Sequence, residues 1–178
     1  KDALKILKSK KNLRLLQLNK ENIKIEKKST FKSILGGILE QDIDNEVDQT
    51  NEWSCVTQIK PISEEFNDLR FSWKICKHVK SNAIVISKNQ QTIGIGAGQM
   101  NRVGAAKIAL DSAKDSANGA VLASDGFFPF SDSVEIANQY GIKSIIQPGG
   151  SVRDQESIDM CNELGISMIF TNKRHFLH

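Results

Sequence analysis

Hydrophobic and polar residues alternate most regularly in the last third of the chain, where short apolar runs are separated by segments with helical spacing. We expect the following elements there: strands at Ala120–Ser124, Ile142–Gln147 and Ile166–Phe170, and helices at Asp132–Tyr140 and Arg153–Leu164. Gly141 and Gly165 stand where the two helices end. Strands and helices that alternate through short links predict an α/β fold, with a mainly parallel sheet covered by helices.

The pattern before residue 120 is weaker but still predicts several elements. They are a helix at Asp2–Lys10, a buried strand at Leu13–Leu18, a polar stretch at Asn19–Lys32, a strand entered from the turn Gly36-Gly37, an acidic loop at Glu40–Glu52, a strand at Trp53–Gln58, a helix that Ser63 caps, strands at Asn82–Ser87 and Thr92–Ile95 joined by the turn Lys88-Asn89-Gln90, and a helix from about Asn101 to Asp115.

Length, charge and cysteine usage place the chain in a broad class. Its 178 residues fit one domain or two small halves that share a core. The net charge of +3 is too small to indicate nucleic acid, and no apolar run reaches the roughly 18 residues of a membrane span. Cys55, Cys76 and Cys161 lie far apart, as expected of reduced thiols in the cytosol. The absence of an initiator Met indicates a piece of a longer protein.

The charges are unevenly distributed along the chain. Residues 1–28 carry ten Lys and Arg against three acids, whereas residues 40–68 carry nine acids and one lysine. A solvated basic face followed by a solvated acidic loop explains this pattern. Contact with a neighbouring subunit or with an absent segment explains it as well.

The loops that follow the last three strands are chemically rich. They are Asp125–Ser133, the PGGS turn at residues 148–151, and the tail TNKRHFLH at residues 171–178. Because the carboxyl ends of parallel strands meet at one edge of a sheet, the crevice outside them is the usual ligand site of an open α/β sheet. We expect the three loops to converge there.

Several residues in these loops allow two interpretations. The stretch SDGFFPFSDS at residues 124–133 either packs its own small core or forms a pocket for a flat ring. Asp132 either caps its helix, with Glu135 completing a capping box, or accepts hydrogen bonds from a heterocycle. Ser151 is a helix cap with Asp154, or the N–H groups of Ser151 and Val152 meet a polar acceptor.

Two arginines are equally ambiguous. Arg102 is a solvated surface cation or the binding group for an anion, and Arg174 belongs to a frayed tail or holds a phosphate with its bidentate fork. Other chemistries are not supported. GIGAG at residues 94–98 lacks the GxGxxG spacing of a dinucleotide loop and fits close backbone packing better. The histidines have no metal-ligand spacing, and no nucleophile elbow is present.

Five segments in order resemble one enzyme family: WKICKHVKSNAIV, IGIGAGQMNRV, SDGFFPFSDS, IQPGGSVRD and TNKRHFLH. They are similar to the C-terminal part of the bifunctional enzymes of purine biosynthesis that combine AICAR formyltransferase with IMP cyclohydrolase. The resemblance covers residues 1–178, including KKNLRLLQL and GGILEQD. A deaminase is disfavoured because the zinc signature HxE…PCxxC is absent.

The resemblance implies a fold and a reaction. The family's formyltransferase region is a pair of cytidine-deaminase-like, three-layer α/β/α subdomains, and residues 1–178 are similar to the second. The implied reaction transfers a formyl group from 10-formyltetrahydrofolate to AICAR, which gives FAICAR, and the parent protein cyclises FAICAR to IMP. The family is cytoplasmic and homodimeric, with small-molecule substrates and neither nucleic acid nor membrane as a partner.

The family's catalytic Lys–His pair lies in a KHxxP motif that this chain lacks. Lys77-His78 is followed by Val79-Lys80-Ser81 instead. We therefore expect no catalytic residue in this chain and no turnover by it alone, with Asn82 in a supporting role. The alternative is a non-catalytic nucleotide-binding or dimerisation module that has kept only the fold.

The resemblance also implies binding residues. Those for AICAR are Asn82, Arg102, Phe127 and Arg174, and those for the folate are Val103, Pro129, Asp132, Ser151 and Val152. Phe128 and Phe130 are expected to pack beneath them as core. Ser133 departs from relatives that carry Asn there. We expect no metal ion apart from a monovalent cation such as K+ near Asp125 and the tail.

Overall fold

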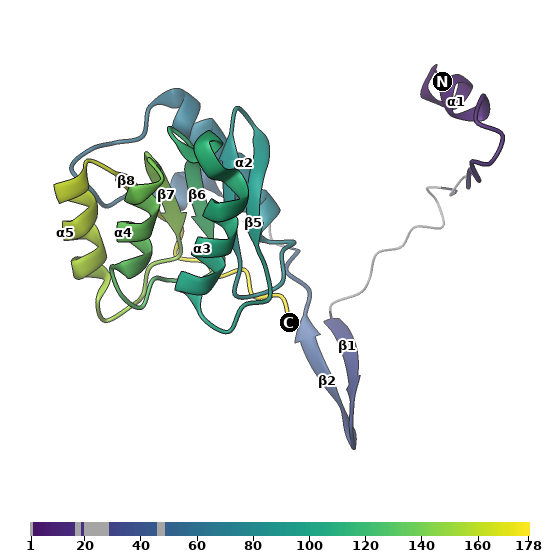
Figure 1. The fold of residues 1–178 in the computed structure, drawn as a ribbon. Helices are drawn as coiled ribbons and strands as arrows, with labels where there is room; N and C mark the ends of the chain where they lie inside the picture. Colours follow the sequence, from purple (N-terminus) through teal and green to yellow (C-terminus); the bar gives the residue numbers. More distant parts are fainter. Residues whose placement is uncertain (1, 17–18, 20–28, 46–48) are drawn as a thin grey trace. The chain divides into compact units, whose positions relative to one another are not determined.

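The computed structural model describes residues 2–16, 19, 29–45 and 49–178, which form two compact units, Lys1–Asn45 and Glu46–His178 (Figure 1). Among the described residues, no helix combines the length and apolar character needed to cross a membrane. The three cysteines all lie in the described part and are free thiols.

The described residues of the first unit form one short helix and one β-hairpin. Helix α1 spans Asp2–Lys8, and strands β1 (Ser29–Ile34) and β2 (Gly37–Asp42) pair in antiparallel register around the turn at residues 35–36. The predicted strand after the glycine turn is present, but β2 already begins at Gly37 and continues to Asp42, so residues 40–42 belong to a strand and not to the predicted acidic loop. Strand β1 was not predicted, because its apolar residues are too few and too scattered within a lysine-rich stretch to stand out.

The predicted buried strand at Leu13–Leu18 is wrong where the structure describes it. Residues 13–16 form no strand, and the Leu16 side chain is exposed. Residues 17 and 18 lie outside the described residues. A short apolar run does not by itself distinguish a strand from other structure. No described strand pairs with residues 13–16.

The second unit is built on a six-stranded sheet with the order β3-β8-β7-β6-β4-β5. Its strands are β3 (Ser54–Cys55), β4 (Ile84–Lys88), β5 (Gln91–Gly96), β6 (Val121–Ser124), β7 (Ser144–Gln147) and β8 (Ser167–Phe170). Strands β6, β7 and β8 are parallel neighbours, whereas β3 pairs antiparallel with β8, and β4 pairs antiparallel with both β6 and β5. The sheet is therefore mixed: β5, β6, β7 and β8 run in one direction, and β3 and β4 run in the opposite direction.

Helices cover both faces of this sheet. Helix α2 (Ser63–Cys76) lies on one face, and α3 (Arg102–Ala113), α4 (Asp132–Gln139) and α5 (Asp154–Leu164) lie side by side on the other (Figure 1). Two short 3-10 helices, η2 (Thr50–Glu52) and η3 (Lys114–Ala117), complete the unit. The predicted three-layer α/β/α architecture is confirmed.

The two cores follow from the alternation of side chains along the strands. Ile84 and Ile86 of β4 face α3, whereas Val85 between them faces Leu69 and Trp73 of α2. The same alternation continues across β6 and β7. Because both faces of the sheet are covered, its central strands are nearly continuous runs of apolar residues, which is why the sequence predicted them clearly.

Helix α2 starts one residue differently from the prediction. Ser63 is its first helical residue and not its cap; Ile62 occupies the cap position. The carboxylate of Glu65 accepts a hydrogen bond from the Ile62 backbone N–H at 3.2 Å and so satisfies the helix start from within the first turn. A serine before two acids is not sufficient to fix the cap position.

Candidate functional site

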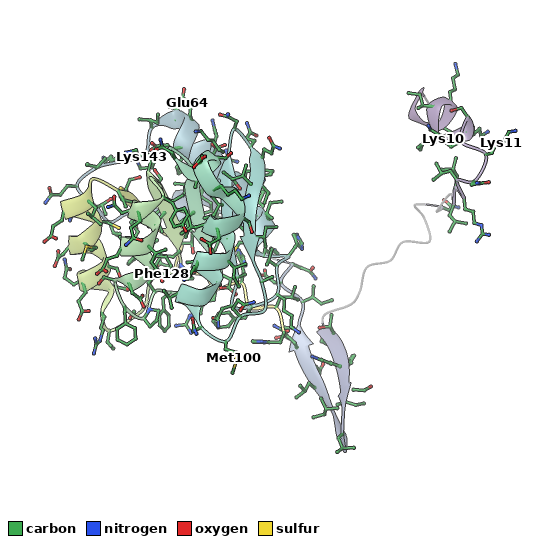
Figure 2. The ribbon with its side chains drawn as sticks, in the orientation of Figure 1. Lys10, Lys11, Glu64, Met100, Phe128 and Lys143 are labelled. Atoms are coloured by element: carbon green, nitrogen blue, oxygen red, sulfur yellow. The ribbon has the colours of Figure 1, made fainter. Side chains whose placement is uncertain are left out.

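Many of the residues that the sequence singled out lie at one edge of the sheet, the one at which strands β6, β7 and β8 end. Because β4 runs antiparallel to β6, its first residues lie at the edge where β6, β7 and β8 end. Strand β5 returns to the same edge and leads into α3. Figure 2 shows Met100 at this end of the second unit, and Glu64 and Lys143 at the opposite end.

Two glycines of β5 let α3 lie directly against the sheet. A Cβ atom built on Gly96 would be 1.9 Å from the Ala105 carbonyl oxygen, and one on Gly94 would be 2.0 Å from that of Ala109. These distances leave no space for a side chain, so GIGAG serves backbone packing. Asn101 then caps α3, since its Oδ1 accepts the Gly104 N–H at 2.7 Å.

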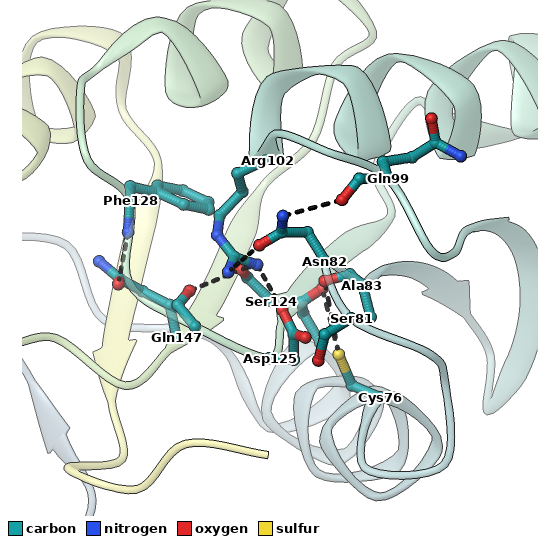
Figure 3. Close-up of polar contacts among 12 residues, drawn as sticks. Cys76, Ser81, Asn82, Ala83, Gln99, Arg102, Ser124, Asp125, Phe128 and Gln147 are labelled. Carbon is teal, nitrogen blue, oxygen red and sulfur yellow. Dashed lines mark hydrogen bonds and ion pairs between the residues drawn. The ribbon is translucent and has the colours of Figure 1, made fainter. Parts of the chain in front are cut away.

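Arg102, the first residue of α3, is buried at the centre of a polar network (Figure 3). Its Nη1 donates to Ser124 Oγ at 2.8 Å and forms an ion pair with Asp125 Oδ1. Its Nη2 donates to Asn82 Oδ1 at 2.9 Å. The interpretation of Arg102 as a solvated surface cation is therefore wrong. The side chain is buried, and these partners compensate for the water that its guanidinium has lost.

The network leaves part of the guanidinium available. Three hydrogen bonds to described residues use three of its five N–H groups, so two remain for a ligand. Asn82 holds the guanidinium in place, and its own Nδ2 donates to the Gln99 carbonyl at 2.9 Å. Arg102 is therefore a donor whose orientation is fixed before any ligand arrives.

Cys76 lies on the α2 side of this network. Its thiol contacts the Ala83 and Ala123 carbonyl oxygens at 3.8 and 3.9 Å. Burial raises the pKa of the Cys76 thiol well above its ordinary value, and the Asp125 carboxylate raises it further against an opposing effect of Arg102. The thiol is consequently neutral and not a nucleophile.

A pocket of about 370 Å³ opens over the network. Its lining residues are Asn82, Met100, Asn101, Arg102, Phe127, Pro129 and Phe176. Three polar residues, from the segment before β4 and from the start of α3, thus line the pocket together with two aromatic rings and a proline. A flat heterocycle with polar edges fits such a pocket, because the rings offer apolar faces and Arg102 offers directed N–H groups.

Arg174 lies beside this pocket. Its guanidinium stands over the Phe127 ring, 4.9 Å from the centroid, and 5.9 Å from the centroid of Phe176. The tail that carries it is held by backbone hydrogen bonds from His175 N to Asp125 O and from Ser81 N to Leu177 O, both 3.0 Å. The interpretation of Arg174 as part of a frayed end is therefore wrong.

The aromatic loop divides its three rings between different environments. Phe128 is fully buried in the core, as predicted, and Phe127 is half-buried at the pocket. Phe130 was predicted as core and is 50% exposed, with the Arg153 guanidinium 4.8 Å from its ring centroid. Phe130 lies just before the cap residue of α4, Ser131.

Asp132 does not cap its helix. It is the first residue of α4, Ser131 occupies the cap position, and Asp132 Oδ1 accepts the N–H of the next residue, Ser133, at 2.7 Å. The predicted capping box with Glu135 is absent from α4. The cap interpretation of Asp132 is wrong, and Asp132 is half-buried where the loop that carries Phe127 ends.

Ser151 also lies outside its helix. Helix α5 begins at Asp154, whose carboxylate reaches back to the Gly150 N–H at 2.7 Å, while Ser151 Oγ accepts the Arg153 N–H at 3.2 Å. Ser151 therefore stabilises the turn before the helix. Ser151 is half-buried and the Val152 side chain is fully exposed.

The structure brings only some of the predicted site residues together. Asn82, Arg102, Phe127 and Pro129 line one pocket, whereas Val103, Asp132, Ser151 and Val152 do not line it. Sequence reasoning missed Met100, Asn101 and Phe176 as lining residues. Their proximity in sequence to Arg102 and Arg174 was the only available signal.

The comparison with protein families decides which family this is. The chain matches the family described as "AICARFT/IMPCHase bienzyme" over residues 1–112, which is more than half of its length. The chain belongs to this family. The resemblance seen in the five sequence motifs is thereby confirmed.

Members of the family from Prochlorococcus marinus are similar over nearly the whole chain. The "Bifunctional purine biosynthesis protein PurH" of Prochlorococcus marinus subsp. pastoris is 64% identical over 177 residues, and that of strain MIT 9312 is 65% identical over 177 residues. Each alignment covers 99% of this chain and 34% of the relative. The chain thus spans about a third of the length of the curated relatives it matches.

Solved structures are similar to a lower degree. Acinetobacter baumannii RibD, form 2, is 17% identical with a TM-score of 0.41, and covers 61% of this chain and 35% of its own. The dCMP deaminase from the cyanophage S-TIM5 in apo form is 15% identical with a TM-score of 0.41, and covers 61% of this chain and 98% of its own. In the part of this chain that the structure describes, no three His, Cys, Asp or Glu side chains gather in a way that could hold a metal ion.

Proposed function

We propose that this chain is the C-terminal subdomain of the AICAR formyltransferase region in a bifunctional, cytoplasmic and homodimeric enzyme of purine biosynthesis. In this proposal the chain binds AICAR and 10-formyltetrahydrofolate, and the rest of the parent protein supplies the catalytic Lys–His pair and the cyclohydrolase. The parent transfers the formyl group to give FAICAR and then cyclises FAICAR to IMP.

One observation carries the proposal: the pocket over Arg102. Three of the four residues proposed for AICAR line it, and the fourth, Arg174, stands over the ring of Phe127. The imidazole of AICAR would lie against Phe127, and the fixed N–H groups of Arg102 would meet its polar edge. Arg174, an exposed cation at the pocket margin, suits a phosphate.

The folate residues support the proposal by position. Pro129 lines the pocket and Asp132 lies three residues further on, at the start of α4, so a second flat ring next to the imidazole would meet both. The half-buried Asp132 carboxylate can accept hydrogen bonds from the N–H groups of a pterin. Ser151, Val152 and Val103 are proposed to line the more distant part of the folate.

The chemistry explains why this chain alone should not turn over substrate. The exocyclic amine of AICAR is a weak nucleophile because its lone pair is delocalised into the ring and carboxamide. Formyl transfer therefore needs a base for the amine proton and a cation for the developing oxyanion. Neither Lys77 nor His78 lines the pocket, so this chain supplies binding and orientation.

A monovalent cation beside Asp125 is part of the proposal and rests on one buried oxygen atom. Asp125 Oδ1 is taken by Arg102, but its Oδ2 is buried and has no hydrogen-bond partner among the described residues. A carboxylate oxygen in this state is a suitable ligand for K+. Turnover by the full-length protein in potassium salts should then exceed turnover in tetramethylammonium salts; equal rates would remove the cation from the proposal.

A formyl-transfer assay on two proteins tests the main proposal. The full-length protein should convert AICAR and 10-formyltetrahydrofolate to FAICAR, and the isolated chain should not. Turnover by the isolated chain would overturn the assignment of the base to the absent part. Inactivity of the full-length protein would overturn the proposed reaction.

Asp132→Ala in the full-length protein separates binding from the alternative of a non-catalytic module. If Asp132 binds the pterin, KM for the folate rises and turnover falls. Asp115→Ala, an exposed aspartate in η3, is the matched control and should leave both unchanged. Unchanged kinetics for Asp132→Ala would favour a nucleotide-binding or dimerisation module.

A further inference from the structure

Gln147 is a buried polar residue that the proposed mechanism does not use. It is the last residue of β7, and its side chain is fully buried. Its Oε1 accepts hydrogen bonds from the Phe128 N–H at 3.2 Å and from the Gly149 N–H at 3.3 Å, and its Nε2 donates to Met168 Sδ at 3.4 Å. Figure 3 shows the contact with Phe128 beside the Arg102 network.

All three loops at this edge of the sheet are bonded to Gln147. Phe128 belongs to the loop after β6 and Gly149 to the loop after β7. The backbone carbonyl of Gln147 accepts the N–H of Thr171, the first residue after β8, at 3.0 Å. One residue thus fixes the three loops relative to each other.

The bond to Phe128 controls the pocket wall directly. Its N–H lies between Phe127 and Pro129, both of which line the pocket. A buried N–H without a partner is costly, so the backbone must keep the position in which Gln147 accepts it. The Phe127 ring is therefore held in place from the interior.

The bond to Gly149 acts in the same way on the loop before α5. Gly149 has φ +72°, and a Cβ atom built on it would be 2.5 Å from the Phe170 ring. This loop is consequently pressed against Phe170 and fixed by the same amide oxygen that holds Phe128. Ser151 and Val152 follow within three residues.

We propose that Gln147 is a positioning residue that couples the AICAR wall at Phe127 to the folate loop at Ser151 and Val152. This inference rests on the proposed function. Because a single oxygen accepts from both loops, its loss releases both at once. Affinity for the two substrates should therefore change together, although neither substrate touches Gln147.

The test compares two substitutions in the full-length protein. Gln147→Met keeps the length and removes the acceptor, and Gln147→Glu keeps an acceptor for both N–H groups. Gln147→Met should raise KM for AICAR and for the folate by about five-fold or more each, since one buried hydrogen bond is lost to each loop. Gln147→Glu should restore both KM values toward wild type. Gln139→Met, at an exposed position in α4, is the control.

Hydrogen–deuterium exchange provides a readout that does not depend on catalysis. The amides of Phe128 and Gly149 should lose protection in Gln147→Met and keep it in Gln147→Glu. Faster exchange at both amides with unchanged KM values would overturn the positioning role and leave only a structural one. A rise in only one KM would overturn the coupling. If Gln147→Met does not fold, Gln147→Asn, which draws the oxygen back by one methylene, replaces it with the same expectations.

The same experiment keeps the inference apart from the proposed function. Formyl transfer by the wild-type protein is measured first, and its absence would contradict the proposed function itself. Formyl transfer by the wild-type protein, together with unchanged KM values in Gln147→Met, would contradict only the positioning role of Gln147.

Discussion

Arg102 and Asp125 form an ion pair in which both side chains are almost completely buried, with 7% and 0% exposed. A surface ion pair contributes little to stability, but removing one partner of a buried pair leaves an uncompensated charge in a medium of low dielectric constant. The pair therefore gives the pocket a directed cation and makes the stability of the second unit depend on it.

Asp125→Asn is expected to destabilise the second unit by about 3 kcal/mol, because the Arg102 charge loses its counter-charge while the shape is kept. Urea unfolding followed by the fluorescence of Trp53 and Trp73, which both lie in this unit, measures the change. Asp115→Asn at an exposed position is the control and should stay within about 0.5 kcal/mol of wild type. Equal stability of the two variants would contradict the role given to the pair.

Gly96→Ala is expected to push α3 away from the sheet, since the new Cβ atom would be 1.9 Å from the Ala105 carbonyl oxygen. Overpacking against backbone costs about 1–3 kcal/mol or more, and it displaces Arg102 at the start of α3. The melting temperature of the full-length protein and its affinity for AICAR should both fall. Gly37→Ala, where nothing lies closer than 3.9 Å, should change neither.

Arg174→Ala is expected to raise KM for AICAR by about 10- to 100-fold, if the guanidinium binds the phosphate. Arg174→Lys should recover only part of the loss, because an ammonium keeps the charge and lacks the bidentate fork. Lys173→Ala tests whether any cation of the tail suffices. Lys173 is the neighbouring cation, and its Nζ lies 4.0 Å from Glu52 Oε2. An equal effect of Lys173→Ala and Arg174→Ala would indicate general electrostatic attraction instead of a specific site.

Cys161 is expected to resist alkylation in the folded protein. Burial raises the pKa of its thiol to about 12, so the thiolate fraction at pH 8 is roughly 10⁻⁴. Mass spectrometry after treatment with iodoacetamide at pH 8 should find Cys55, which is half-buried, modified before Cys161. Modification of Cys161 at the rate of Cys55 would contradict its burial.

The raised pKa of Cys161 also predicts the direction of a pH effect on stability. The unfolded thiol ionises near its ordinary value and the folded one only near 12, so the unfolded state binds fewer protons between these values. Stability from this group is complete below the unfolded pKa and is lost as pH rises toward 12. Cys161→Ala should show a smaller alkaline loss of stability than wild type in urea unfolding.

The parts of the fold that could be predicted from sequence are those buried on both sides. Apolar runs such as Ile84–Ile86 and Val121–Ala123 have few alternatives to a central strand. Strand β1 lacked this signal, because its residues are largely exposed in the structure. Leu16 carried the apolar signal without the burial, since no described strand pairs with its segment.

The site was predictable at the level of loops and motifs and less so at the level of contacts. Topology alone predicted that the loops after β6, β7 and β8 would meet, and Gln147 now joins them. The partners of Arg102 could not be predicted, because Ser124 and Asp125 are more than 20 residues away and depend on the antiparallel insertion of β4. The pattern also did not distinguish Phe128 from Phe130, since both are apolar and only Phe128 is buried.

The tight turn at residues 89–90, between β4 and β5, lies at the opposite end of these strands from the pocket. Its backbone N–H groups at Asn89 and Gln90 are held by the Asp68 carboxylate at 2.8 and 2.6 Å, and the side chain of Gln90 is exposed. A fluorophore attached at position 90 would therefore sit on a rigid support away from every residue proposed to bind substrate. The turn offers a place from which to watch ligand binding without obstructing it.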